Sequence, residues 1–176
     1  MKKVVVLIML VVVSLCFILI RHSDTAQPVF KIGAVLPMSG KFADNGMSIF
    51  VGLRMAVDDL NRLHGKKYEL VVLDTKSESK NAVLGFNKLV DIDKVDVVVT
   101  TMSDNSLALK PVALQRQKML FCIASHTDIV KDNKGIIFRP CNTGAQESLC
   151  IANYIDKKLK GKTVFVYTFN TEAGLD

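Results

Sequence analysis

Three observations predict an α/β fold for this sequence, with a parallel sheet and helices on both faces. Short apolar runs alternate along the chain with longer segments whose apolar residues recur every three or four positions. The short runs are apolar almost throughout, which is typical of strands buried on both faces of a parallel sheet. The first run, 31–36, ends in the turn residues Pro37, Ser39 and Gly40 directly before an amphipathic segment, which is typical of a strand-to-helix corner.

The first half of the chain holds two strand and helix pairs. After the strand at 31–36, apolar residues spaced by three and four positions from Ile49 to Leu63 predict a helix, and Gly65 is expected to end it. The apolar run at 68–74 has the length of a strand. After a polar link, the segment 81–91 predicts a second helix.

The second half continues this alternation. The run at 95–101 is β-branched almost throughout and predicts a buried strand. The helix at its end, 146–160, is expected to turn Ile151, Ile155 and Leu159 inward. Because strands and helices alternate strictly, we expect right-handed crossovers between parallel strands. The remaining elements are strands at 119–123, 136–139 and 163–168 and a helix at 106–118.

Length and charge set limits on function. The chain has 176 residues, and an apolar leader leaves about 150 of them for folding, enough for one ordinary domain core. The formal net charge is +6, but three of the bases flank the leader, so the rest carries 20 basic and 17 acidic side chains. Because this balance is mild and the aromatic residues do not interleave with the bases, no nucleic-acid partner is expected.

The segment 1–26 predicts export from the cytoplasm. Two lysines precede the apolar run 4–20, which is typical of either a signal peptide or a membrane anchor. Cleavage after Ala26 is disfavoured because Asp24 stands where a small residue is wanted. The positive-inside rule places the rest of the chain outside. We therefore expect a periplasmic or extracytoplasmic protein, and anchoring to the inner membrane by residues 4–20 stays open.

From about Val29 to Asp176, several motifs follow one another without large gaps; each is weak alone, but their order and spacing are specific. They are Lys31-Ile-Gly-Ala-Val-Leu-Pro-Met-Ser-Gly40, the glycines Gly46 and Gly52 of a helix that runs to Asn61, Glu69-Leu-Val-Val-Leu-Asp74, the helix 81–90, the segment 97–103, Lys110-Pro-Val112 and Phe138-Arg139. In this arrangement the sequence resembles the leucine/isoleucine/valine-binding type of periplasmic solute-binding protein, of the type I periplasmic binding protein family.

The resemblance implies a domain organisation and partners. Members of this family have two α/β lobes joined by a hinge, close on a small ligand that is often an amino acid, and deliver it to the permease subunits of an ABC importer. When the motifs are matched to the family in this order, 27–140 is an incomplete first lobe. Residues 141–176 are then the hinge crossing and the start of a second lobe that is only begun. We therefore expect an amino-terminal fragment, a truncated gene or a degraded copy.

The resemblance also implies a ligand site. Ser103 falls where the family places a hydroxyl that binds the ligand's α-carboxylate, and the helix amino terminus beside it would favour the same anion. The Ala124-Ser125-His126 turn matches a segment that holds the ligand's carboxylate and ammonium groups, with His126 in place of a threonine. Asn45 lies where an aromatic side chain often covers the ligand, so the wall of the site is expected to be more polar than in branched-chain amino acid receptors.

Simpler interpretations stand beside these assignments. Ser103 could cap the helix that follows, and capping and binding are about equally supported. His126 alone in a polar loop is more often a solvated residue than a ligand. In the second lobe, Asn170 or Thr171 aligns with an aromatic residue that closes over the ligand in the family.

Catalysis, cofactors and metals find no support in the sequence. It contains no Gly-x-Ser-x-Gly turn, no phosphate-binding loop of the Gly-Lys-Ser/Thr type and no metal-spaced pair of histidines. Neighbouring Asp58 and Asp59 are expected to face solvent. Cys141 and Cys150 could form a disulfide if the turn between them brings them close. We therefore predict a protein that is not an enzyme and binds neither metal nor cofactor.

Three functional hypotheses follow. The first is the solute receptor of an ABC importer, which the family register favours. The second is the ligand-sensing ectodomain of a membrane-anchored receptor, which the anchor-like run 4–20 favours. The third is a truncated remnant that binds nothing, which the early stop favours.

Overall fold

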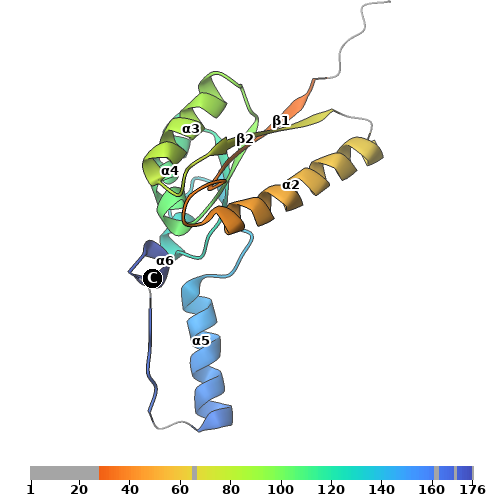
Figure 1. Ribbon diagram of the computed structural model, residues 1–176. Coiled ribbons are helices and arrows are strands. Elements are labelled where there is room, and N and C mark those ends of the chain that lie inside the picture. Colours follow the sequence, from red (N-terminus) through yellow and green to blue (C-terminus); the bar gives the residue numbers. More distant parts are fainter. Residues whose placement is uncertain (1–27, 65–66, 161–162, 169, 176) are drawn as a thin grey trace, which may run out of the picture.

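The computed structural model describes residues 28–64, 67–160, 163–168 and 170–175, and the predicted leader lies outside them. The chain forms one five-stranded parallel sheet in the order β2-β1-β3-β4-β5 (Figure 1). Its strands are β1 (Phe30–Leu36), β2 (Tyr68–Asp74), β3 (Val97–Thr101), β4 (Met119–Ile123) and β5 (Ile137–Phe138). All four pairings between neighbouring strands are parallel, which confirms the predicted fold class.

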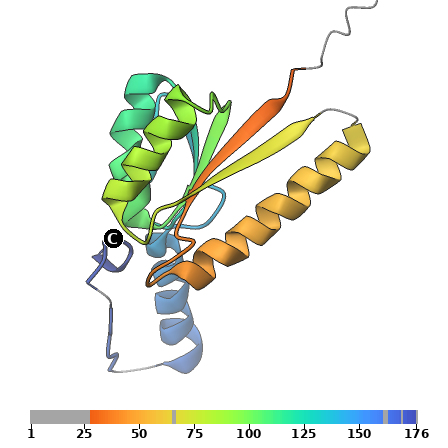
Figure 2. The same ribbon diagram turned by 45° about the horizontal axis from the view of Figure 1, so that its top comes forward.

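Helices cover both faces of this sheet. Their bounds are α2 (Ala43–His64), α3 (Ser79–Asp91), α4 (Ser103–Arg116), α5 (Gly144–Tyr154) and α6 (Glu172–Leu175), with a 3-10 turn η1 (Thr127–Ile129) and a π-helical turn η2 (Ile155–Leu159). Figure 2 shows α3 and α4 side by side on one face of the sheet and α2 on the other. This arrangement of strands and helices is the layered α/β architecture that alternating segments predict.

Two apolar clusters, one on each face, hold the layers together. Under α3 and α4, fully buried side chains such as Phe86, Leu89 and Leu109 pack against the sheet. Under α2, half-buried residues including Ile49 and Leu53 pack against β1 and β3. Every residue of β3 is buried, which explains why that segment is apolar and β-branched almost throughout.

Most predicted elements agree with the observed ones, and the strands at 68–74 and 119–123 agree in both bounds. The helix expected from residue 106 begins three residues earlier, at Ser103, because the backbone of Met102 turns the chain directly from β3 into α4. Asp58 and Asp59 face solvent as expected, each paired with an arginine on the same helix.

Residues 141–175 depart further from the prediction. The residues 163–168 form no strand, and they are exposed to solvent. The predicted helix 146–160 is α5 followed by the π-helical turn η2, and two of its supposed inward residues, Ile151 and Leu159, are 60% and 62% exposed. The physical reason is that, in the described part of the chain, no sheet lies beside α5 to bury them (Figure 1). Among the described helices, none is long and apolar enough to cross a membrane.

The disulfide that Cys141 and Cys150 could have formed is not present in the structure. Cys141 and Cys150 are both free and exposed, so the turn between them does not join their thiols. Cys122 on β4 is also free, and burial raises the pKa of its thiol to about 11. It therefore stays protonated at neutral pH and serves as a small core residue.

Candidate functional site

The candidate site lies at the carboxyl edge of the sheet, where β3 passes into α4. Ser103 is the first residue of α4 and is only 3% exposed. Its hydroxyl oxygen has no hydrogen-bond partner among the described residues. The N-cap of α4 is instead Met102, whose side chain makes no capping bond. The structure therefore gives Ser103 no capping hydrogen bond, and a buried hydroxyl is left at a helix amino terminus, where an anion is favoured.

The backbone before Ser103 is strained. Met102 has φ 69° and ψ 137°, a left-handed conformation that residues with a side chain rarely adopt. Its carbonyl accepts a hydrogen bond from the N–H of Ser106, 3.0 Å away, so the strained residue is fixed by the first turn of the helix. Outliers of this kind cost about 1–3 kcal/mol and cluster at ligand sites.

Other buried polar groups surround this edge, and the sequence alone did not single them out. Thr75 follows β2 and is fully buried, and its hydroxyl has no partner in the described structure. Asn105 is 2% exposed and accepts a hydrogen bond from the Ser79 hydroxyl at 3.1 Å, while its amide nitrogen has no partner among the described groups. Both residues lie within a few positions of a predicted strand end, which is the signal that could have found them.

The Ala124-Ser125-His126 turn follows β4 at the same edge. All three of its carbonyl groups accept hydrogen bonds from the segment that leads into α5: Ala124 from the thiol of Cys141 (3.2 Å), Ser125 from the N–H of Gly144 (3.2 Å), and His126 from the guanidinium of Arg139 (3.0 Å). The structure thus ties this turn to the predicted hinge crossing.

The His126 side chain connects the turn to the last described segment. Its Nδ1 accepts a hydrogen bond from the N–H of Asp128 at 3.1 Å, and its Nε2 lies 3.7 Å from a carboxylate oxygen of Glu172. The N–H of Glu172 in turn donates to Asp104 on α4, at 3.3 Å. Residues up to 68 positions apart therefore meet at this edge, where α6 lies beside α4 (Figure 1), and Thr171 directly precedes Glu172 in the sequence.

The corner between β1 and α2 forms another part of the same edge. The Asp74 carboxylate accepts hydrogen bonds from the N–H groups of Met38, Ser39 and Lys76 and from the Ser39 hydroxyl. Burial raises the pKa of Asp74, but these hydrogen bonds outweigh that effect and hold the pKa below its usual value. Asn45 stands exposed in the first turn of α2, just after this corner.

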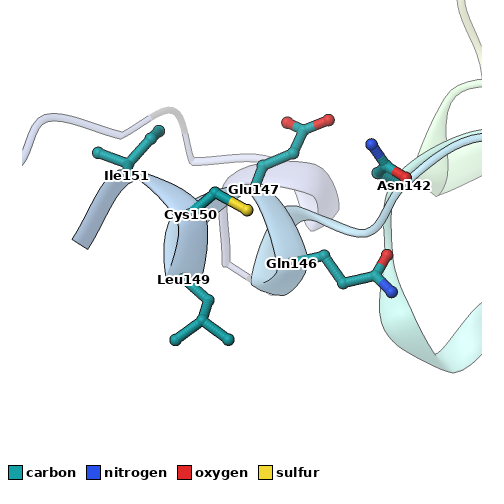
Figure 3. A pocket seen from close by; sticks show the side chains of 6 residues that line it. All are labelled: Asn142, Gln146, Glu147, Leu149, Cys150 and Ile151. Atoms are coloured by element: carbon teal, nitrogen blue, oxygen red, sulfur yellow. The ribbon is translucent and has the colours of Figure 1, made fainter. Parts of the chain in front are cut away.

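An open pocket elsewhere contains none of the predicted site residues. It lies on α5 and the residues before it, and Figure 3 shows the side chains that line it, which include Leu149, Cys150 and Ile151. These are exposed side chains of the helix that lacks a neighbouring sheet. Within the described ranges, no cluster of three or more His, Cys, Asp or Glu side chains could hold a metal ion.

A doubly covered parallel sheet with unpartnered hydrogen-bonding groups at its carboxyl edge defines a ligand-binding α/β lobe. Comparison with known proteins agrees with this class. The periplasmic binding protein family model matches residues 29–176, and the chain belongs to this family.

Relatives and solved structures give the same result. The chain is 27% identical over 159 residues to the Leu/Ile/Val-binding protein BraC3 of Rhizobium johnstonii and 29% identical over 140 residues to an amino acid binding protein of Pseudomonas aeruginosa. These alignments cover 88% and 77% of this chain but only 42% and 37% of those proteins. The chain therefore spans about two fifths of the length of the relatives it matches.

Among solved structures, the substrate-binding protein LivJ of Streptococcus pneumoniae in complex with isoleucine has a TM-score of 0.70 and 28% identity. The match covers 76% of this chain and 39% of that one. A periplasmic binding protein of Burkholderia mallei has a TM-score of 0.74 at 24% identity, over 84% of this chain and 40% of that one, which supports the fold.

Family membership confirms two predictions. The family resemblance suggested by the motifs is correct, and the family consists of binding proteins rather than enzymes. Because these are periplasmic binding proteins, membership also implies an extracytoplasmic location.

Proposed function

We propose that this chain supplies the first lobe, and the opening of the second, of a receptor that binds an amino acid or a related small polar solute for an ABC importer. The supporting relatives are named for binding leucine, isoleucine and valine or amino acids, and one structural relative contains isoleucine. Residues 27–140 would form the first lobe and 141–176 the hinge crossing and the start of the second. The permease subunits of the importer would be its protein partners.

One observation supports the position of the proposed binding site. Ser103 is a buried hydroxyl without a hydrogen-bond partner in the described structure, at the amino terminus of a fourteen-residue helix. A buried polar group without a partner is costly, and a ligand carboxylate would remove that cost. Ala124, Ser125 and His126 stand on the neighbouring turn, and Asn45 on the far side of the edge would border the same solute.

The proposed mechanism is a population shift between open and closed lobes. The solute would bind first to Ser103 and the amino terminus of α4, and the second lobe would then close over it about the hinge. The contacts between the turn at 124–126 and the segment 139–144 would carry the closure to the first lobe. The permease subunits would bind the closed form.

The test is a Ser103→Ala variant of the protein that carries this chain, titrated with branched-chain amino acids by calorimetry. Loss of a hydrogen bond to a charged ligand group should weaken binding by about 1.5–3 kcal/mol. Ser48→Ala is the matched control, because the Ser48 hydroxyl is exposed on α2 and bonds only to its own helix backbone. Unchanged affinity in Ser103→Ala would remove this residue from the site.

A second candidate is the sensing ectodomain of a membrane-anchored receptor. The apolar run 4–20 favours it, since such a run without a good cleavage site would stay in the inner membrane. Sequencing the amino terminus of the mature protein tests it. A terminus at or after residue 27 would exclude the anchor, and a retained leader in the membrane fraction would support it.

A further inference from the structure

The hydrogen bonds around the turn at 124–126 indicate what kind of chemical group this edge of the sheet can bind. A backbone N–H can only donate, so the bond from the N–H of Asp128 makes Nδ1 of His126 an acceptor. In a ring whose Nδ1 accepts, the proton is carried by Nε2. Nε2 is the atom that faces the Glu172 carboxylate. His126 therefore presents a donor to the site.

The backbone acceptors of this turn already take part in hydrogen bonds within the protein. The carbonyl groups of all three turn residues accept hydrogen bonds from Cys141, Gly144 and Arg139. Of the two nearby carboxylates, Asp104 accepts a hydrogen bond from the N–H of Glu172, and a Glu172 oxygen lies 3.7 Å from Nε2 of His126. At position 126 the turn thus presents the Nε2 donor of the histidine ring, where another side chain could have presented an acceptor.

The contact with Glu172 shows that an acceptor reaches this donor. Its carboxylate oxygen lies 3.7 Å from Nε2, and the His126 side chain is only 14% exposed. Ser103, the neighbour in sequence of the Asp104 that accepts from Glu172, is a buried hydroxyl that can also donate. A solute with two oxygen groups would satisfy both.

We infer that the solute of this site presents a carboxylate and a neighbouring hydroxyl or oxo oxygen, as in a 2-hydroxy or 2-oxo carboxylic acid, and that His126 donates to one of these oxygens. In the structure, the Glu172 carboxylate faces the same donor. This inference rests on the proposed function, because it assigns the solute class of the same site.

The test uses two probes that differ in one group. Leucine and 2-hydroxy-4-methylpentanoate share a carboxylate and a carbon skeleton, and differ in an ammonium against a hydroxyl. Both are titrated by nuclear magnetic resonance into the isotope-labelled protein that carries this chain. The hydroxy acid should bind at least about tenfold more tightly, a difference of about 1.4 kcal/mol. Equal binding or a preference for leucine would overturn the inference while leaving the proposed function intact, and binding of neither would overturn both.

Two further measurements address His126 itself. The imidazole nitrogen shifts should report a proton on Nε2 in the free chain, and a proton on Nδ1 alone would contradict the inference. His126→Thr keeps a side-chain acceptor for the N–H of Asp128 but replaces the ring donor with a hydroxyl that can accept. It should lose the preference for the hydroxy acid, whereas the control His64→Thr, on the exposed end of α2, should keep it. An unaltered preference in His126→Thr would also contradict the inference, and the wild-type titration stands even if that variant does not fold.

Discussion

Residues 30–139 and residues 141–175 are made of similar apolar segments but differ in what covers them. In the first region Phe86, Leu89 and Leu109 are fully buried between helices and sheet. In the second, Leu149 is 64% exposed and Phe165 is 90% exposed. The second region still forms α5, whose start is fixed by a capping box of Thr143 and Gln146. Local hydrogen bonds are therefore enough to start a helix, whereas a core needs a second layer to pack against.

The largest expected effect separates the two regions directly. Phe86→Ala should lower the free energy of unfolding by about 3–5 kcal/mol, because it leaves a cavity in a closed core. Phe165→Ala removes the same ring from an exposed segment and should change it by less than about 0.5 kcal/mol. Denaturant unfolding of both variants measures the difference. Equal losses would show that the second region is buried in solution.

Two glycines of α2 test how tightly the first region is built at its corner. A Cβ on Gly46 would lie 2.1 Å from the carbonyl oxygen of Pro37, so Gly46→Ala should cost about 1–3 kcal/mol as the corner shifts. Gly52→Ala meets nothing within 4 Å and should stabilise the helix by about 0.5–1 kcal/mol. Thermal unfolding followed by circular dichroism compares them. If Gly46→Ala were stabilising, the backbone at Pro37 would be able to move away from the new Cβ at no cost.

The carboxylate at the same corner should make the first region sensitive to acid. Because hydrogen bonding holds the pKa of Asp74 below its unfolded value, its contribution is present above about pH 4 and is lost as the pH falls through the folded-state pKa. Asp74→Asn should cost about 1 kcal/mol at pH 7, at the low end for a charged hydrogen bond because the group is exposed.

The check is a series of unfolding curves from pH 7 to pH 2. The difference between the wild type and Asp74→Asn should shrink as the pH falls. A difference that stays constant over this range would show that the pKa of Asp74 is the same in the folded and unfolded states.

The most local effect should appear in the second region alone. Thr143→Ala removes the hydroxyl that accepts from the N–H of Gln146 and should cost α5 about 1 kcal/mol. Faster amide exchange confined to 144–154 would report it. If exchange also rose throughout α3 and α4, the two regions would unfold as one unit and the comparison would fail.

The sequence predicted the first region well because its signals are local. Apolar runs and spacings of three and four placed the strands β2 and β4 and both layers of helices, since each of these segments has a partner in the described chain. The same signals were misleading at 163–168, a run of strand-forming residues with no sheet to join. Pattern alone does not indicate whether the partner layer is present.

For the candidate site, the sequence located the edge but not its hydrogen bonds. The family resemblance placed Ser103 and His126 just after β3 and β4, two strands that pair with each other. It could not show that the turn carbonyls are occupied, because Cys141, Gly144 and Arg139 reach them from 13 to 19 positions further along the chain. It also could not place Glu172 beside His126, a contact that only the folded chain creates.

The strained backbone of Met102 has a consequence for engineering this chain. A glycine at this position would adopt the same φ without penalty, so a screen that rewards only heat resistance should enrich Met102→Gly. The gain would come from relief of the backbone strain in the residue that precedes Ser103. The same change would give the start of α4 more backbone freedom, which makes position 102 one to protect when variants are selected for stability alone.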